Sequence, residues 1–124
     1  MNPADLFSHE TNPVRLAPSQ TLFTAGDAPD VMYVVLEGSL DILVGGKIVE
    51  KAGRGAIVGE MALIDQSQRG ATVVAPVAAS LAKIDAPRFQ RLIQQNPFFA
   101  THVMKILVDR IRHMNQLLVQ SKVV

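Results

Sequence analysis

The fold of this chain is decided in residues 32–49, which read MYVVLEGSLDILVGGKIV. An apolar run closed by a Glu-Gly pair is followed by Leu40, Ile42 and Val44, which share one face of a strand because side chains alternate with period 2. Gly45-Gly46 then separates two apolar segments, and this favours a two-residue hairpin because glycine tolerates positive φ. The stretch therefore predicts short strands joined by tight glycine turns.

Similar segments continue on both sides of this stretch. Further strands are expected at 21–24, 71–75 and 80–84. Residues 1–19 hold three prolines among polar residues, so we expect an N-terminal arm there with at most a short helical turn. The organised domain is expected to cover residues 20–124.

The strand-like pattern ends at Asp85, which can N-cap a helix over 87–95. Asn96 and Pro97 are typical of the cap and first turn of a second, longer helix that reaches about Ser121. Strands that come first and helices that follow are typical of an α+β fold, with the strands rolled into a compact barrel or sandwich.

Composition excludes several classes of protein. The chain has 124 residues, 48% of them apolar and 19% charged, which fits one globular domain. A net charge of +1 gives no overall attraction to nucleic acid or membranes, and the absence of cysteine rules out disulfides and cysteine-based chemistry. No secretory signal and no apolar run of the ~20 residues that span a bilayer are visible, so we expect a cytoplasmic protein.

Residues 59–75, which read GEMALIDQSQRGATVVA, carry the chemistry. Gly59 permits a tight turn or a close backbone approach, and one helical turn after it would present free N–H groups to an anion. A polar loop then returns the chain at Arg69, so the two ends of this excursion are expected to face each other.

The residue types at these two ends suit a sugar joined to one anionic phosphate. Arg69 offers a planar fork of donors that matches phosphate, and Glu60 offers a carboxylate that accepts from a sugar hydroxyl. Small side chains at Ala62 and Ala71 leave room for the ligand.

This segment resembles the phosphate-binding cassette of the cyclic nucleotide-binding domain family, which includes the regulatory subunits of cyclic-AMP-dependent kinase and the bacterial catabolite activator. The family pattern is G-E-x-A-L, a short loop and then R-x-A, and it is matched by residues 59–63 and 69–71. The resemblance to the family covers about residues 20–121 of this chain. Ala56 and Val58 depart from the aspartate and phenylalanine that are frequent in the family, which concerns packing rather than binding.

The resemblance implies a double-stranded β-helix, a jelly-roll-like β-roll, with C-terminal helices. It also implies that Glu60 binds the ribose 2′-hydroxyl and that Arg69 binds the cyclic phosphate. Gly59 belongs to the same cassette, and further phosphate contacts are implied for the backbone near Met61, Ala62, Gly70 and Ala71.

Three residues are candidates for contact with the base, and two of them, Val49 and Asn115, lie outside the cassette. Val49 could line the base pocket, as could Met61, and core packing is an equal alternative for both. Asn115 lies on the long helix near the place where family members touch the purine, and an exposed helix residue is the alternative. Three scattered histidines lack the spacing of a metal site, so neither a metal nor a cofactor is expected.

Gly70 bears on the choice of purine. Guanine-selective members of the family often carry threonine or serine directly after the arginine, where the hydroxyl can bond the guanine amino group. Gly70 has no side chain to offer, so the expected ligand is cyclic AMP rather than cyclic GMP.

The long helix carries apolar residues at alternating spacings of three and four, which form a heptad seam: Met104, Leu107, Ile111, Met114 and Leu118. A neighbouring apolar stripe could pack on the roll and leave the seam for a partner helix. Bacterial members of the family dimerise through this helix, so a homodimer through 97–121 is expected. The alternative is a helix that packs only on its own barrel.

These patterns predict a sensor without enzymatic activity, in which ligand binding shifts the cassette turn and the C-terminal helices move with it. It would be a stand-alone domain that acts on an unknown protein and makes no nucleic-acid or membrane contact itself. Two alternatives stay open: the sensor half of a Crp/Fnr-type transcription regulator that ends before its DNA-binding domain, and a ligand-free dimerisation module.

Overall fold

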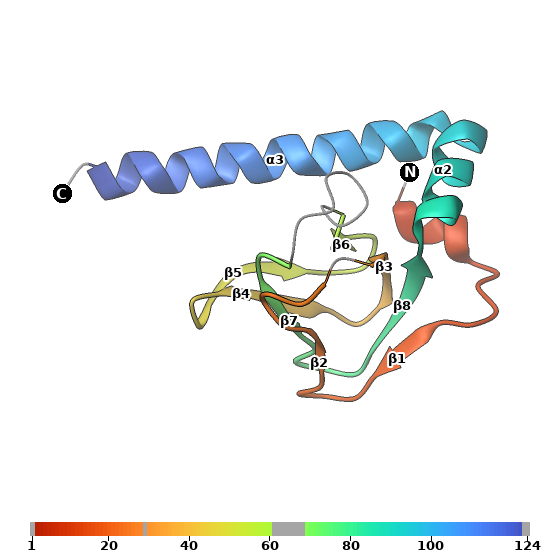
Figure 1. Ribbon diagram of the computed structural model, residues 1–124, viewed down its shortest axis with the longest axis horizontal. Helices are drawn as coiled ribbons and strands as arrows, with labels where there is room; N and C mark the ends of the chain where they lie inside the picture. Colours follow the sequence, from red (N-terminus) through yellow and green to blue (C-terminus); the bar gives the residue numbers. More distant parts are fainter. Residues whose placement is uncertain (1, 29, 61–68, 123–124) are drawn as a thin grey trace. The chain divides into compact units, whose positions relative to one another are not determined.

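The computed structural model describes residues 2–28, 30–60 and 69–122, and the chain divides into two compact units, 1–90 and 91–124. The elements of the first unit are η1 (Pro3–Phe7), β1 (Val14–Leu16), β2 (Thr21–Phe23), β3 (Met32–Glu37), β4 (Leu40–Val44), β5 (Lys47–Ala52), β6 (Ile57–Val58), β7 (Thr72–Val74) and β8 (Ala79–Ile84). Helix α2 (Ala86–Gln95) runs across the division, and α3 (Pro97–Lys122) belongs to the second unit (Figure 1).

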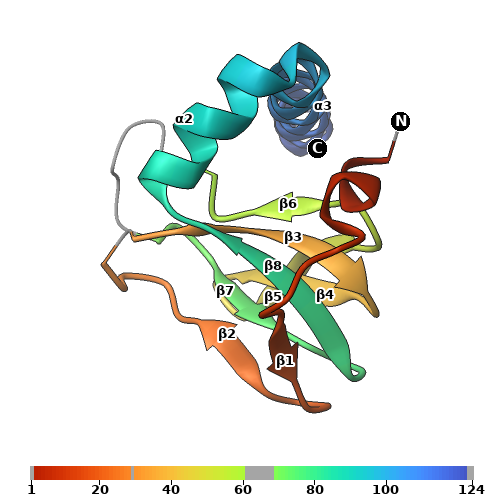
Figure 2. The same ribbon diagram turned by 90° about the vertical axis from the view of Figure 1, so that its right-hand side faces the viewer.

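The strands of the first unit form two antiparallel four-stranded sheets, which Figure 2 shows from the side. One sheet has the order β1-β8-β3-β6, and the other has the order β2-β7-β4-β5. Each sheet thus pairs strands from the beginning of the unit with strands from its end, as a jelly-roll-like β-roll does. The predicted α+β fold with two C-terminal helices is confirmed.

The β4–β5 hairpin has the predicted turn. Gly45 and Gly46 take φ angles of 59° and 79°, and both strands pair directly on either side of them. Positive φ at both central residues is the geometry that glycine permits and that the twist of paired strands requires.

A single core joins the two sheets. Its buried residues come from strands of both sheets and from the turns beside them: Leu16, Val35, Leu40, Ala52, Val58, Val73, Ala75, Ala79 and Leu81. Burying one such valine or leucine side chain stabilises a fold by ~1.5–3 kcal/mol. The core therefore fixes the frame that holds the described loop residues 24–28, 30–31, 59–60 and 69–71.

The N-terminal segment contains more structure than a helical turn. Asn2 caps η1, because its Oδ1 atom accepts from the Ala4 N–H at 2.9 Å. The segment also supplies β1, which pairs with β8 so that Val14 lies opposite Leu81. A strand of three residues has too little alternation to be recognised in a sequence.

Both helices begin as predicted, within one residue. Helix α2 begins at Ala86, and the Asp85 side chain accepts from the Arg88 N–H at 2.9 Å, which is the geometry of an N-cap. Helix α3 begins at Pro97, whose missing N–H is no loss at a first helical position.

Candidate functional site

Arg69 is fixed by its backbone before its side chain makes any contact. Its N–H donates to the Asp27 carbonyl at 3.0 Å, and its own carbonyl accepts from the Gly26 N–H at 2.8 Å. These two bonds join the chain just before β7 to the loop between β2 and β3. The side chain is thereby aimed at the neighbouring end of β3.

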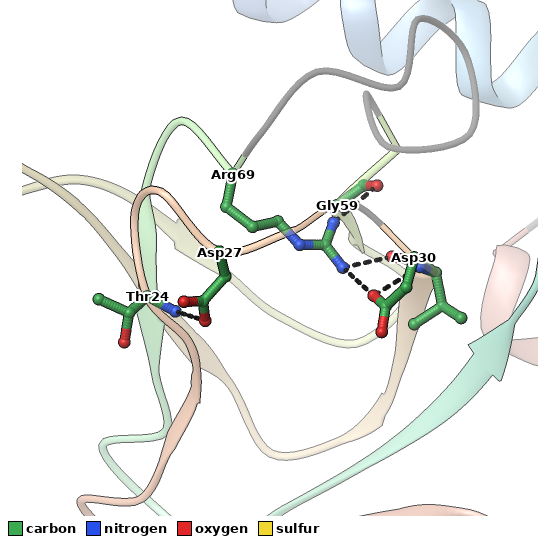
Figure 3. Close-up of polar contacts among 6 residues, drawn as sticks. Thr24, Asp27, Asp30, Gly59 and Arg69 are labelled. Carbon is green, nitrogen blue, oxygen red and sulfur yellow. Dashed lines mark hydrogen bonds and ion pairs between the residues drawn. The ribbon is translucent and has the colours of Figure 1, made fainter.

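The Arg69 guanidinium is buried among backbone oxygens (Figure 3). Its Nη1 donates to the Gly59 carbonyl at 3.2 Å, and its Nη2 donates to the Val31 carbonyl at 2.6 Å. Nη2 also lies 3.0 Å from Oδ1 of Asp30, with which it forms an ion pair. The two ends of the 59–69 excursion therefore meet, as the sequence predicted.

Gly59 must be glycine for this contact to exist. Its φ is +77°, and a Cβ atom there would lie 2.5 Å from Nη1 of Arg69 and 3.1 Å from the Val31 carbonyl oxygen. Both the backbone conformation and the space exclude a side chain. Gly59 thus acts as a positioning residue for the guanidinium.

An aromatic stack supports the face of the guanidinium. The Arg69 Cζ atom lies 4.2 Å from the centre of the Phe23 ring, a distance at which a cation is attracted to the ring. Phe23 in turn stacks on Tyr33, with ring centres 6.5 Å apart. The plane of the Arg69 donors is therefore set by a ring as well as by hydrogen bonds.

The charge at this place comes from Arg69 and Asp30. Burial raises the pKa of the Tyr33 phenol, Asp30 raises it further and Arg69 lowers it, so Tyr33 stays neutral near pH 7. Among the described residues, the Nε atom of Arg69 has no hydrogen-bond partner although it is buried. A planar cation with an unused donor at a buried Nε atom suits an oxyanion.

Glu60 is the next residue after Gly59 and is only 4% exposed. Gly59 is the residue whose carbonyl accepts from Arg69. A carboxylate oxygen has two lone pairs, so Glu60 can also accept from a hydroxyl group of a ligand. Both charged residues that the sequence singled out are therefore buried, and their contact with a ligand stays a prediction.

The other predicted site residues divide into three groups. Gly70 is exposed and Ala71 is half-buried beside Arg69, and no atom of the described residues lies within 4 Å of a Cβ atom placed on Gly70. Met61 and Ala62 lie outside the described residues. Val49 is exposed on β5, and Asn115 is exposed on α3 in the second unit, so contact of either with a base stays a prediction.

Sequence reasoning missed Asp30, Phe23 and Tyr33. Asp30 is 39 residues from Arg69, and no local spacing connects the two. The hydrogen bonds of Gly26 and Asp27 to the Arg69 backbone bring this loop to the site, and no local sequence pattern predicts them.

No described helix is both long enough and apolar enough to cross a membrane. Within 2–28, 30–60 and 69–122, no group of three histidine, aspartate or glutamate residues is arranged to hold a metal ion.

Comparison with known proteins identifies the family. Residues 13–96 match the family model described as "Cyclic nucleotide-binding domain". Lysophospholipase nte1 of Aspergillus oryzae is 34% identical over 114 residues, which are 88% of this chain and 7% of that protein. The chain spans a small part of such relatives, so their lysophospholipase activity is not carried over to it.

Two solved structures have a similar fold. The Thermus thermophilus Catabolite Activator Protein aligns with a TM-score of 0.79 and 22% identity, covering 94% of this chain and 62% of that one, a likeness that concerns the fold alone. A structure from a cyclic-GMP-dependent signalling pathway that regulates bacterial phytopathogenesis aligns with a TM-score of 0.72 and 27% identity, covering 86% of this chain and 89% of that one.

Proposed function

This chain belongs to the cyclic nucleotide-binding domain family, and from that premise we propose that it binds cyclic AMP and acts as a sensor in signal transduction. It catalyses no reaction in this proposal. Binding takes place in the cytoplasm and is passed on through the C-terminal helices to another protein.

The observation that carries the proposal is that the Arg69 guanidinium is buried and has an unpartnered Nε donor among the described residues. A buried guanidinium is costly unless anions or carbonyl dipoles surround it. Its ion-pair partner is a largely exposed carboxylate, and its Nε donor has no partner among the described residues. A phosphate oxygen would satisfy Nε, and a second oxygen of the same phosphate can take a terminal nitrogen.

Glu60 and the small residues nearby complete the proposed ligand. The buried Glu60 carboxylate accepts from the ribose 2′-hydroxyl, since it follows directly on the turn that holds Arg69. Gly70 and Ala71 leave space on the other side of the arginine. A phosphate and a ribose hydroxyl are adjacent in a cyclic mononucleotide, which is why one compact site can hold both.

The preference for cyclic AMP rests on Gly70. A bound guanine buries its amino group without the hydroxyl that threonine or serine would supply, a penalty of ~1–3 kcal/mol. We therefore expect cyclic AMP to bind about 5- to 150-fold more tightly than cyclic GMP.

Calorimetric titration of the whole chain with cyclic AMP and cyclic GMP tests both statements. Absence of binding by either nucleotide contradicts the proposed function. Equal or tighter binding of cyclic GMP contradicts only the base preference. Gly70→Thr is the matched variant, because the open space at Gly70 accepts a side chain and the added hydroxyl should narrow the gap.

We propose in addition that the chain forms a homodimer through α3. Large apolar side chains are exposed along this helix, among them Met104, Ile111 and Met114 of the predicted seam. Leu107 of the seam is half-buried, and the side chain of Leu118 lies outside the described residues. Such a row of apolar residues on one helix favours a partner helix.

Light scattering tests the dimer. Wild type should be a dimer at micromolar concentration, and Leu107→Glu with Ile111→Glu should give a monomer because like charges meet at an apolar contact. Gln116→Glu adds the same charge to an exposed position away from the seam and should leave the dimer intact. A monomeric wild type contradicts the proposal.

A second role, as one part of a larger protein, is favoured because this chain aligns with only part of its relatives. The chain corresponds to 7% of one curated relative and to 62% of the Thermus thermophilus protein. The same sensor could therefore serve as one part of a larger regulator, with its ligand site unchanged.

A further inference from the structure

The two units of the chain carry opposite net charges. With histidines counted as neutral, residues 91–124 hold five basic residues and one aspartate, a net charge of +4, whereas residues 1–90 hold seven basic and ten acidic residues, a net charge of −3. Basic side chains of the first unit form ion pairs with its acids: Lys51 with Asp41, Arg54 with Asp5, Arg69 with Asp30 and Arg88 with Glu10. The excess positive charge is therefore concentrated in the unit that consists mainly of α3.

Three exposed side chains form a row along α3: Phe98, Lys105 and Arg112. Successive members are seven residues apart, nearly two helical turns, so they lie on one side of the helix at intervals of about 10 Å. Phe98 is 74% exposed. Neither cation has an ion-pair partner among the described residues. An exposed aromatic ring and two unpaired cations thus share one face of α3.

This row is separate from the apolar seam proposed for the dimer. Lys105 directly follows Met104, and Arg112 directly follows Ile111. One residue turns an α-helix by about 100°, so the row lies well around the helix from these two seam positions. A second copy seated on the seam would therefore leave the row open to a different partner.

The side chains of the row favour an acidic protein segment as that partner. Two carboxylates at a matching spacing can pair with the two cations, and Phe98 adds an aromatic anchor, a residue type enriched in protein interfaces. A continuous polyanion such as a nucleic acid or an anionic lipid surface fits less well. The exposed Asp109 lies between the two cations in sequence and repels phosphate groups.

We propose that the row of Phe98, Lys105 and Arg112 is the docking surface for an acidic segment of another protein. Lys105 and Arg112 pair with carboxylates of that segment, and Phe98 packs against its apolar side chains. The inference rests on the proposed function, because it gives the chemistry of the protein to which the C-terminal helices pass the binding signal.

The test is fluorescence anisotropy with a labelled helical peptide of ~20 residues, a length at which an isolated helix can form. One face of this glutamate peptide carries two glutamates at the spacing of Lys105 and Arg112 and a leucine to meet Phe98. In the control peptide, glutamine replaces both glutamates. The whole chain is titrated with each peptide, with and without cyclic AMP. The glutamate peptide should bind roughly 3- to 30-fold more tightly than the control peptide.

Variants of the chain locate the binding surface. Lys105→Glu with Arg112→Glu should weaken binding of the glutamate peptide roughly 5- to 100-fold, because two attractions become repulsions. Phe98→Ala should weaken it about 5-fold or more through the lost apolar contact. Lys47→Glu with Lys83→Glu makes the same change of charge at exposed lysines of the first unit and should stay within about 2-fold of wild type. Circular dichroism melting confirms that each variant is folded.

Equal binding of the two peptides, or unchanged binding by the double variant of Lys105 and Arg112, overturns the inference. Tighter binding of duplex DNA or of phosphatidylserine vesicles than of the glutamate peptide also overturns it, because the row would then be a phosphate site. Calorimetry with cyclic AMP decides the proposed function separately. A chain that binds the glutamate peptide but no cyclic nucleotide keeps the docking surface and loses the sensor role. A chain that binds cyclic AMP but not the peptide keeps the sensor role, and the inference is wrong.

Discussion

Arg69 and Arg88 are held by the same kinds of contact at two places in the β-roll unit. The guanidinium of Arg69 lies over Phe23, and that of Arg88 lies over Phe7, 5.1 Å from the ring centre. Each arginine also donates to a backbone carbonyl; for Arg88 the acceptor is Lys83, at 2.9 Å.

The two arginines differ in which member of the ion pair is buried. At Arg69 the cation is buried and its acid is exposed, whereas Arg88 is 32% exposed and its partner Glu10, 2.8 Å away, is 10% exposed. Arg88 therefore covers a half-buried acid and ties the N-terminal segment to the start of α2. Arg69 is a buried cation with an exposed acid, and the proposed ligand site rests on this difference.

Exchange of each arginine for alanine should separate the two roles most clearly. Arg69→Ala removes the phosphate anchor, and the affinity for cyclic AMP should fall by ~2–5 kcal/mol, roughly 30-fold to several-thousand-fold. Arg88→Ala should leave the affinity within about 3-fold, because it does not touch the site, and should lower the melting temperature. Calorimetry and thermal melting of both variants measure this. Unchanged affinity in Arg69→Ala would show that Arg69 is not the phosphate anchor and that the two arginines do not differ in this way.

Substitution of Glu60 and of Glu10, the ion-pair partner of Arg88, tests the same difference with a smaller expected effect. Glu60→Gln keeps the shape but weakens a charge-assisted hydrogen bond to the ribose, so the loss should be at most ~1.5–3 kcal/mol. Wild type should bind 2′-deoxy cyclic AMP poorly, and Glu60→Gln should discriminate less between the two ligands. Glu10→Gln should affect melting only. Undiminished discrimination by the Glu60 variant would show that another group reads the hydroxyl.

The aromatic supports should give the smallest effect. Phe23→Leu keeps an apolar side chain but removes the ring beneath Arg69, which should weaken cyclic AMP binding by ~0.5–1 kcal/mol, roughly 2- to 5-fold. Tyr33→Phe keeps the stacked ring and should leave the affinity as it is. Equal losses in the two variants would mean that ring packing, rather than the cation–ring contact, determines the result.

Much of the fold could be predicted from local patterns. Alternation in Leu40–Val44 and the pair Gly45-Gly46 predicted a hairpin that is present, and Asp85 marked the start of α2. The strands that were missed, β1 and β6, have three and two residues. At that length their existence depends on pairing with strands far along the chain, which no local pattern reports.

The site shows the same limit. Gly59 and Arg69 could be matched because ten residues separate them within one recognisable segment. The carboxylate and the ring that complete the surroundings of the guanidinium come from β2 and the loop after it. They reach Arg69 because the backbone of Gly26 and Asp27 is hydrogen-bonded to the backbone of Arg69. That pairing exists only in the folded β-roll, so the sequence does not show it.

The pairing of β1 with β8 has a consequence for the order in which the chain folds. These strands come from opposite ends of the first unit, and β1 lies at the edge of its sheet next to β8. During synthesis β1 waits without its partner until residues 79–84 have been made, and the Arg88 clamp closes later still. Contacts this distant in sequence slow folding. A nascent fragment that ends before β8 would expose an unpaired strand edge, the kind of surface at which chains associate with one another.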